Sequence, residues 1–275
     1  MRISVLMDDT ASSPAFACEH GLSFYLSDER RHILFDMGAS GLFLDNARQL
    51  GIDMAQTELA VLSHGHADHG GGLGDFLRAC PGARVYLHAD ALKPHYTRRA
   101  NGAVEYIGID PRLACEPRLV PLQTDLRLDE DVTLFSSVGV EYWRPQTQGT
   151  HLAGGPGGLR PDSFSHEQSL LFRSGDTLVL VAGCAHRGIL NILSRAVELA
   201  GRPVDAVVGG FHLSNPRDGG CVPEETLDLV AEGLLRYPGT AYYTCHCTGA
   251  EAFEGLWRRM GERLHWVGAG AQLDL

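Results

Sequence analysis

Four potential metal ligands crowd into one short segment of this sequence. In LSHGHADHGGG (residues 62–72), His64, His66, Asp68 and His69 directly follow the apolar run LAVLS. The end of a strand followed by glycines is a place where irregular backbone can direct several side chains at one point. Three imidazoles and a carboxylate suit divalent zinc, and iron or manganese are also accommodated. The segment therefore predicts a metal site, most readily for zinc, rather than a polar loop with scattered histidines.

The elements around this segment are predicted as a small sheet followed by alternating helices and strands. Three β-rich runs open the chain, RISVLM, GLSFYLS and HILFDMG, and predict a strand meander. From residue 41 the apolar spacing becomes helical and ends at Gly51, and the run ELAVLSH then predicts a buried strand. The second half again alternates helices and strands, a pattern typical of helices packed outside sheets.

Two segments interrupt this alternation. Residues 91–118 predict a helix and loop excursion, in which the basic stretch KPHYTRR (93–99) favours a solvated helix face over a phosphate-binding surface. Residues 144–163 are rich in glycine and proline and predict a mobile flap beside the site rather than a domain linker.

Composition excludes several classes of protein. The 275 residues are 44% hydrophobic and 21% charged, as in globular proteins, and the net charge of −11 offers no extended cationic face for nucleic acid. The longest apolar run (178–185) is far shorter than the roughly 20 residues of a membrane span. The opening MRISVLMDDT argues against a signal peptide. We therefore expect a cytoplasmic protein without membrane partners, whose seven cysteines are reduced.

With these residues the sequence resembles the metallo-β-lactamase superfamily, whose His-x-His-x-Asp-His signature is matched by residues 64–69. It is similar to the branch that contains the dihydropterin ribofuranosylaminobenzene phosphate synthases and many metal-dependent hydrolases. The branch patterns recur as EHGLS (19–23), LFDMG (34–38), EQSL (167–170), GCAHRGILNI (183–192), GGFHL (209–213) and HCTG (246–249). The resemblance implies an α/β fold, the αββα sandwich of two facing mixed sheets with helices outside, as a single domain over residues 1–275.

The resemblance also implies up to two metal ions. One takes both histidines of the His-x-His pair and a distant third histidine; the other takes Asp68, His69 and a last histidine, matched by His246 in HCTG. Two residues match the third histidine. His186 fits the branch pattern GCAH, whereas His166 fits the superfamily's order along the chain because it precedes the hairpin SLLFRSGDTLVLVAGC.

By that order, Cys184 occupies the position of the carboxylate that commonly bridges the two ions. It is either a thiolate ligand or a small buried residue. Asp36 in LFDMG is implied to orient a ligand or a metal-bound water from behind, with a turn-forming role as the alternative. His212 in GGFHL is implied to bind substrate, with a structural role as the alternative. Cys245 and Cys247 flank His246 in the strand register and are predicted to point away from it.

Hydrolysis is the predicted chemistry, because metals held by neutral imidazoles and carboxylate lower the pKa of water towards ~7 and polarise a carbonyl or phosphoryl oxygen. We expect a small ester or phosphoester substrate, with Asp68 orienting the attacking water and His212 polarising the substrate or protonating the leaving group. Two alternatives stay open: a transferase like the pterin synthases of the branch, acting on a phosphorylated small molecule, and a non-catalytic metal- or ligand-binding protein. The sequence is compatible with one or with two bound metal ions. It does not specify an oligomeric state.

Overall fold

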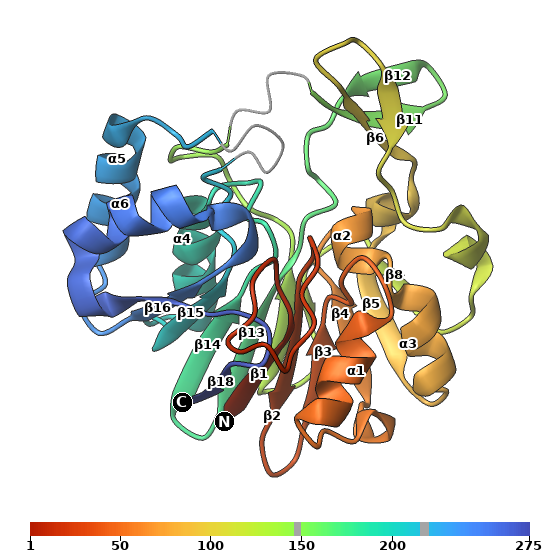
Figure 1. Ribbon diagram of the computed structural model, residues 1–275, viewed down its shortest axis with the longest axis horizontal. Coiled ribbons are helices and arrows are strands. Elements are labelled where there is room, and N and C mark those ends of the chain that lie inside the picture. The colour runs from red at the N-terminus through yellow and green to blue at the C-terminus, as the bar shows by residue number, and fades with distance from the viewer. Residues whose placement is uncertain (146–149, 215–219) are drawn as a thin grey trace. The chain divides into compact units, whose positions relative to one another are not determined.

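The computed structural model describes residues 1–145, 150–214 and 220–275 (Figure 1). The chain divides into two compact units, each described here by itself. The first unit comprises Met1–Thr124, Gln146–Gln168 and Gly268–Asp274, and the second comprises Asp125–Pro145 and Ser169–Val267 with the last residue, Leu275.

In its described residues, the first unit has two sheets and three helices. Its strands are β1 (Arg2–Met7), β2 (Ser23–Ser27), β3 (His32–Phe35), β4 (Leu59–Leu62), β5 (Arg84–His88), β6 (His95–Arg98), β7 (Val104–Tyr106), β8 (Leu119–Leu122), β11 (His151–Gly155), β12 (Gly158–Pro161) and β18 (Gln272–Asp274). Its helices are α1 (Leu42–Gln49), α2 (Ala67–Gly70) and α3 (Leu73–Ala79), with 3-10 turns η1 (Met54–Gln56), η2 (Ala89–Leu92) and η3 (Pro111–Cys115).

The larger sheet has the order β18-β1-β2-β3-β4-β5-β8. The strands from β18 to β3 are antiparallel, which confirms the predicted meander, and β3, β4, β5 and β8 run parallel. Helices α1 and α3 cover one face of this sheet (Figure 1). Phe43 and Phe76 of these helices belong to one buried core cluster with Leu34, Leu62 and Val85 of the sheet. Because β3 and β4 are parallel neighbours, the residues that follow them meet at one edge of the sheet.

The smaller sheet, with the order β12-β11-β6-β7, corrects two predictions from the sequence. The stretch 93–99 is not a helix face, since His95–Arg98 forms strand β6 and pairs with β11. The segment 144–163 is not a plain loop, since β11 and β12 form a hairpin within it. Residues 146–149 of that segment lie outside the described residues. Cross-strand pairing outweighed the local glycine and proline content here, because strand formation depends on partners distant in sequence.

The part of the second unit that the structure describes has one sheet and three longer helices. Its strands are β9 (Leu126–Arg127), β10 (Val132–Phe135), β13 (Ser169–Ser174), β14 (Thr177–Val181), β15 (Ala206–Gly209), β16 (Ala241–Thr244) and β17 (Leu264–Trp266). Its helices are α4 (Ile189–Ala200), α5 (Glu224–Leu235) and α6 (Ala250–Met260), with 3-10 turns η4 (His246–Thr248) and η5 (Gly261–Arg263).

This sheet has the order β17-β16-β15-β14-β13-β10-β9. The predicted hairpin forms between β13 and β14, and the strands from β14 to β17 run parallel. Helix α4 ends at Gly201, whose φ of +68° supplies the left-handed cap that glycine adopts at low cost. Parallel strands again bring the segments after β14, β15 and β16 to one edge. These segments contain GCAH, GGFHL and HCTG.

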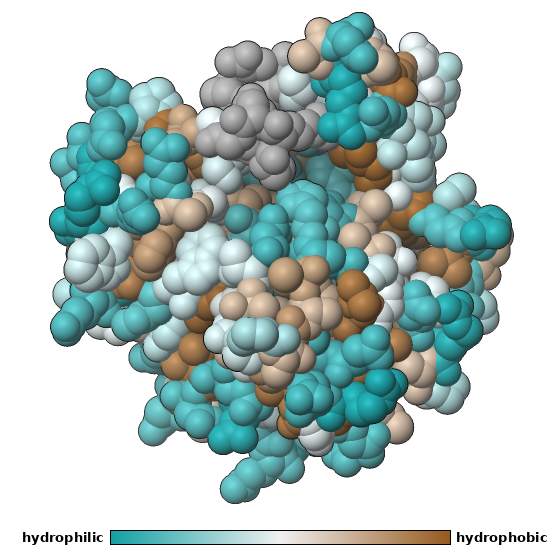
Figure 2. Space-filling view, in the orientation of Figure 1, coloured by the Kyte–Doolittle hydropathy of each residue, from teal (hydrophilic) through white to brown (hydrophobic). Residues whose placement is uncertain are grey.

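Among the described residues, no helix combines the length and the apolar character needed to cross a membrane. Figure 2 shows a mostly hydrophilic face with apolar side chains in small separate groups. Isolated apolar residues of this kind are ordinary on protein surfaces and need no partner.

Candidate metal centre

Asp36, the residue after β3, organises the histidine motif of the first unit. Its Oδ1 accepts a hydrogen bond from the Ser63 amide at 2.7 Å, and its Oδ2 accepts one from the Ser63 hydroxyl at 2.7 Å. The same Oδ2 accepts from Nδ1 of His69 at 2.7 Å. The Ser63 hydroxyl also lies 2.9 Å from Nδ1 of His64. All four residues are completely buried, so this network fixes their side chains.

The network sets the tautomers of two histidines. An ionised carboxylate only accepts hydrogen bonds, so Nδ1 of His69 carries the hydrogen. The Ser63 hydroxyl donates to Asp36 and therefore accepts from Nδ1 of His64. In both rings the basic nitrogen is then Nε2. A hydrogen bond that fixes Nδ1–H is the usual means by which proteins prepare an imidazole for metal binding.

Burial keeps two of the motif histidines neutral. The pKa of His64 is held well below its ordinary value by burial first, and then by the neighbouring His69 and His66. The pKa of His66 is also held well below its ordinary value, chiefly by burial, against an opposing effect of Asp68. Neutral imidazole is the form that binds a metal ion.

The remaining distances in the motif are short. The ring of His64 lies 4.5 Å from that of His66 and 4.2 Å from that of His69, measured between centroids. Asp68 lies in the first turn of α2, with its Oδ2 3.6 Å from Nε2 of His69 and 3.6 Å from Nε2 of the exposed His20. These distances show that His64 lies between His66 and His69 and that Asp68 lies beside His69, all within the segment that follows β4.

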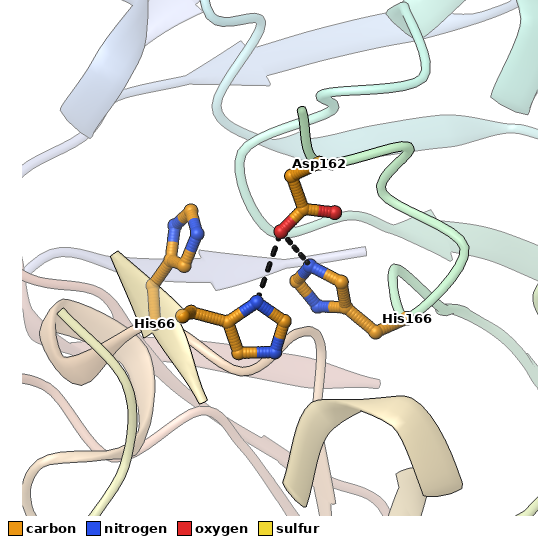
Figure 3. Close-up of side chains that lie close together, drawn as sticks. His66, Asp162 and His166 are labelled. Atoms are coloured by element: carbon orange, nitrogen blue, oxygen red, sulfur yellow. Dashed lines mark hydrogen bonds and ion pairs between the residues drawn. The ribbon is translucent and has the colours of Figure 1, made fainter. Parts of the chain in front are cut away.

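His166 lies in a second cluster of the first unit together with Asp162, as Figure 3 shows, and with His95. One oxygen of Asp162, Oδ2, lies 2.9 Å from Nδ1 of His95 and 3.2 Å from Nε2 of His166. One ligand atom from each of these residues and from His66 lies within 4.8 Å of the others. Nδ1 of His166 accepts a hydrogen bond from the Gly65 amide at 3.0 Å. Both ring nitrogens of His166 are therefore engaged by the protein.

The charges in this cluster follow from its hydrogen bonds. Burial would raise the pKa of Asp162, but hydrogen bonds from His166 and His95 outweigh burial and hold the pKa well below its ordinary value. Burial lowers the pKa of His166, opposed by its bond to Asp162. Asp162 is thus ionised and His166 neutral at physiological pH.

The second unit brings together Cys184, His212 and Cys247. One ligand atom from each lies within 4.8 Å of the others. Cys184 follows β14, His212 follows β15, and Cys247 lies in the turn η4 after β16. Cys247 was predicted to point away from His246 on the basis of strand alternation. Strand β16 ends at Thr244, so that alternation does not reach residue 247.

The chemistry of Cys247 follows from these neighbours. As a thiol, its Sγ donates to the Cys184 carbonyl at 3.4 Å. Burial would raise the pKa of Cys247, but hydrogen bonds with Cys184 and His212 and the nearby His246 hold the pKa well below its ordinary value. Thiolates are soft ligands, so this group suits zinc or a softer ion.

His186 and His246 also belong to the second unit. The ring of His186 lies 4.3 Å from that of His212, and both His186 and His246 are buried. The turn that holds His246 is fixed by Thr248, whose hydroxyl accepts from the Phe211 amide at 2.9 Å and lies 2.5 Å from the Thr244 hydroxyl.

Backbone strain marks many of these positions. Outside glycine, the described residues with a left-handed backbone are Asp36, Phe164, Ala185, His212 and His246. Such conformations cost about 1–3 kcal/mol each and cluster at functional sites. Three of these five were predicted from the sequence as site residues: Asp36, His212 and His246. The other two lie close to predicted site residues along the chain, Ala185 between Cys184 and His186 and Phe164 two residues before His166.

Sequence reasoning missed His95, Asp162 and Cys247. His95 and Asp162 are 67 positions apart and meet because β11 pairs both with β6, which begins at His95, and with β12, which Asp162 follows. The position of Cys247 next to His246 in the sequence could have indicated a place in the site. It was assigned to a continuing strand instead, because the sequence did not show that β16 ends at Thr244.

The donor set of the first unit fits a divalent metal. It combines buried neutral imidazoles, tautomers fixed through Nδ1 in His64 and His69, and a nearby carboxylate in Asp68. The fold and this site are those of a metal-binding protein of the α/β class. The family model of the metallo-beta-lactamase superfamily matches residues 17–188. The chain belongs to the metallo-β-lactamase superfamily, and the predicted α/β fold class is confirmed.

Individual relatives agree with this family. The chain is 32% identical to Tm1679, a metal-dependent hydrolase of the β-lactamase superfamily, whose crystal structure matches with a TM-score of 0.82 over 100% of this chain and 99% of that one. It is 27% identical to the 7,8-dihydropterin-6-methyl-4-(β-D-ribofuranosyl)-aminobenzene-5'-phosphate synthase of Methanocaldococcus jannaschii, over 96% of this chain and 94% of the synthase. An uncharacterised protein of the same organism is 28% identical over 92% of this chain and 93% of its own length.

Proposed function

We propose that this protein is a metal-dependent hydrolase of small esters or phosphoesters, with zinc as its metal. The observation that carries the proposal is the buried hydrogen-bond network in which Asp36 and Ser63 fix Nδ1–H on His64 and His69. That arrangement leaves Nε2 as the basic atom of both rings, which is the arrangement of a metal ligand.

The proposed ligands in the first unit are His64, His66, Asp68 and His69. The sequence resemblance adds His186 and His246, with Cys184 as a further ligand, and these three assignments rest on the resemblance alone. A divalent metal at such residues supplies Lewis acidity and an activated water.

Asp68 is proposed to orient the attacking water. Its side chain is partly exposed, and its Oδ2 lies near Nε2 of both His69 and His20. An ionised carboxylate in this place can accept a hydrogen bond from water and fix its direction of attack. His212 is predicted to polarise the substrate or to protonate the leaving group. Its position beside Cys184 and Cys247 offers it a different role, as a metal ligand together with these two cysteines.

A panel of phosphomonoesters, phosphodiesters and carboxylic esters tests the proposal in zinc-loaded protein. We expect turnover of at least one class, and Asp68→Ala should lower turnover far more than it lowers total bound zinc. Equal losses of zinc and turnover would make Asp68 a ligand without a separate role in orienting water. Tightly bound zinc without turnover of any class would favour the non-catalytic binding protein.

A second candidate is a transferase that joins a dihydropterin to a ribofuranosylaminobenzene phosphate. The observation that favours it is the 27% identity to the named synthase over nearly the whole chain. Mass spectrometry of the protein incubated with activated dihydropterin and the aminobenzene ribofuranosyl phosphate would detect the joined product. Formation of that product without hydrolysis of the ester panel would replace the hydrolase proposal.

A further inference from the structure

We propose that Asp162 and His166 are positioning residues that hold the Gly65 peptide, and with it the two histidines on either side, in the metal-binding arrangement. The inference rests on the proposed function, because it concerns the same metal site. It also decides between the two candidates for the third histidine, since it gives His166 a role other than metal ligand.

Gly65 has close contacts on two sides. Its amide donates to Nδ1 of His166 at 3.0 Å. On the other side, a Cβ at this position would lie 2.5 Å from the Ala91 carbonyl oxygen and 2.8 Å from the ring of His95. A side chain does not fit there, so glycine permits the close approach. The peptide between His64 and His66 is therefore fixed by contacts with both clustered histidines.

Asp162 prepares His166 for this contact. Nδ1 of His166 accepts a hydrogen bond from an amide, so its ring hydrogen must lie on Nε2. Nε2 donates that hydrogen to Oδ2 of Asp162 at 3.2 Å. A neutral histidine in this tautomer has used its lone pair on the Gly65 amide. The geometry therefore assigns His166 to the support of the motif.

Asp162 is in turn anchored by its surroundings. Its Oδ1 accepts from the Phe164 amide at 2.8 Å, and its Oδ2 also lies 2.9 Å from Nδ1 of His95. Nε2 of His95 lies 3.2 Å from the Asp90 carbonyl oxygen. The side chains of Asp162, His95 and His166 are at most 3% exposed, so water competes little for these bonds.

Two substitutions of His166 separate its two contacts. Asparagine places its amide oxygen near the position of Nδ1 and can keep the bond from Gly65 while losing Asp162. Glutamine reaches towards the position of Nε2 and can keep Asp162 while losing Gly65. His166→Ala removes both contacts, and Asp162→Asn removes the charge that fixes the tautomer.

The measurement is zinc stoichiometry and affinity, by competition with a chromogenic chelator, on full-length protein whose folding is checked by circular dichroism. We expect all variants to keep the wild-type number of zinc ions. His166→Asn should bind zinc nearly as tightly as wild type, whereas His166→Gln and His166→Ala should bind about 10- to 100-fold more weakly, the usual effect of losing a supporting residue. Asp162→Asn should also weaken binding.

Three results would overturn the inference. Loss of one zinc equivalent in both His166→Asn and His166→Gln would make His166 a ligand. Wild-type affinity in His166→Ala would remove its positioning role. Wild-type protein that binds no zinc would overturn the proposed function itself. That outcome is distinguishable from the first two, in which wild type binds zinc and only the role of His166 fails. If His166→Ala does not fold, the zinc affinities of His166→Gln and His166→Asn still test whether the contact with Gly65 supports the metal site.

Discussion

The carboxylate of Asp36 accepts a hydrogen bond of 2.7 Å from Nδ1 of His69, and both side chains are fully buried. The two residues lie 33 positions apart and meet because β3 and β4 are parallel neighbours. Asp36 thereby connects the sheet to the metal-binding motif, and it adopts a left-handed backbone to do so. The loop after β4 is thus preorganised by the residue after β3.

Replacing Asp36 by asparagine should weaken zinc binding about 10- to 100-fold. Asparagine has one acceptor oxygen where Asp36 has two, so its NH2 group would face a donor, either the Ser63 amide or Nδ1–H of His69, and the network that orients the ligands would lose a hydrogen bond. Chelator competition measures the effect. Asp53→Asn is the matched control, because Asp53 is exposed and its hydrogen bonds, from the Ala55 amide and the Gln56 side chain, lie within the turn η1. Equal affinities in both variants would show that the Asp36 network does not prepare the ligands.

Gly65→Ala should destabilise the protein by about 1–3 kcal/mol, because its methyl group would overlap the Ala91 carbonyl and the His95 ring. Gly82→Ala is the control, since a Cβ there meets nothing within 4 Å. Urea unfolding of the two variants compares them directly. A Gly65 variant as stable as the Gly82 variant would show that the loop moves freely away from His95.

The metal-free protein should lose stability as the pH falls below about 6.5, the ordinary histidine value. Burial lowers the folded-state pKa of His64 and His66, so the unfolded chain binds more protons than the folded protein in this range. The free energy of unfolding should therefore fall with decreasing pH until the lowered folded-state values are reached. Each histidine contributes a slope of up to about 1.4 kcal/mol per pH unit.

Urea titrations between pH 7.5 and pH 5, a range chosen to span that ordinary histidine value of roughly 6.5, measure this slope. A His64→Gln variant should show a smaller slope than wild type. Identical slopes in the two proteins would show that His64 is protonated as easily in the folded as in the unfolded state.

Cys184 should contribute a thiolate if it is a metal ligand. Protein loaded with cobalt(II) is then expected to show the near-ultraviolet charge-transfer absorption of a cobalt thiolate, and Cys184→Ala should abolish it or strongly reduce it. Cys80→Ala is the control, because Cys80 is a buried cysteine whose Sγ contacts the Met54 carbonyl. A cobalt spectrum without such absorption in wild type would assign Cys184 to packing.

The sequence predicted those parts of the site whose residues are close together along the chain. His64, His66, Asp68 and His69 are found together because they lie within six consecutive residues after β4. The meander β1–β3 and the hairpin β13–β14 follow from local patterns. The cluster of His95 and Asp162 depends on the pairing of β6 with β11, which no local pattern specifies. The position of Cys247 depends on where β16 ends, and strand ends are the least predictable feature of a sequence. The single domain over residues 1–275 stays a prediction.

The most direct test of the account is the metal content of protein purified without added metal, measured by elemental analysis for wild type and His64→Ala. We expect wild type to retain at least one equivalent of a divalent metal, most of it zinc, and His64→Ala to lose at least one equivalent. His265→Ala, at an exposed histidine, should retain the wild-type content. Wild-type protein without bound metal, or a His64→Ala variant with undiminished content, would contradict the assignment of this motif as a metal site.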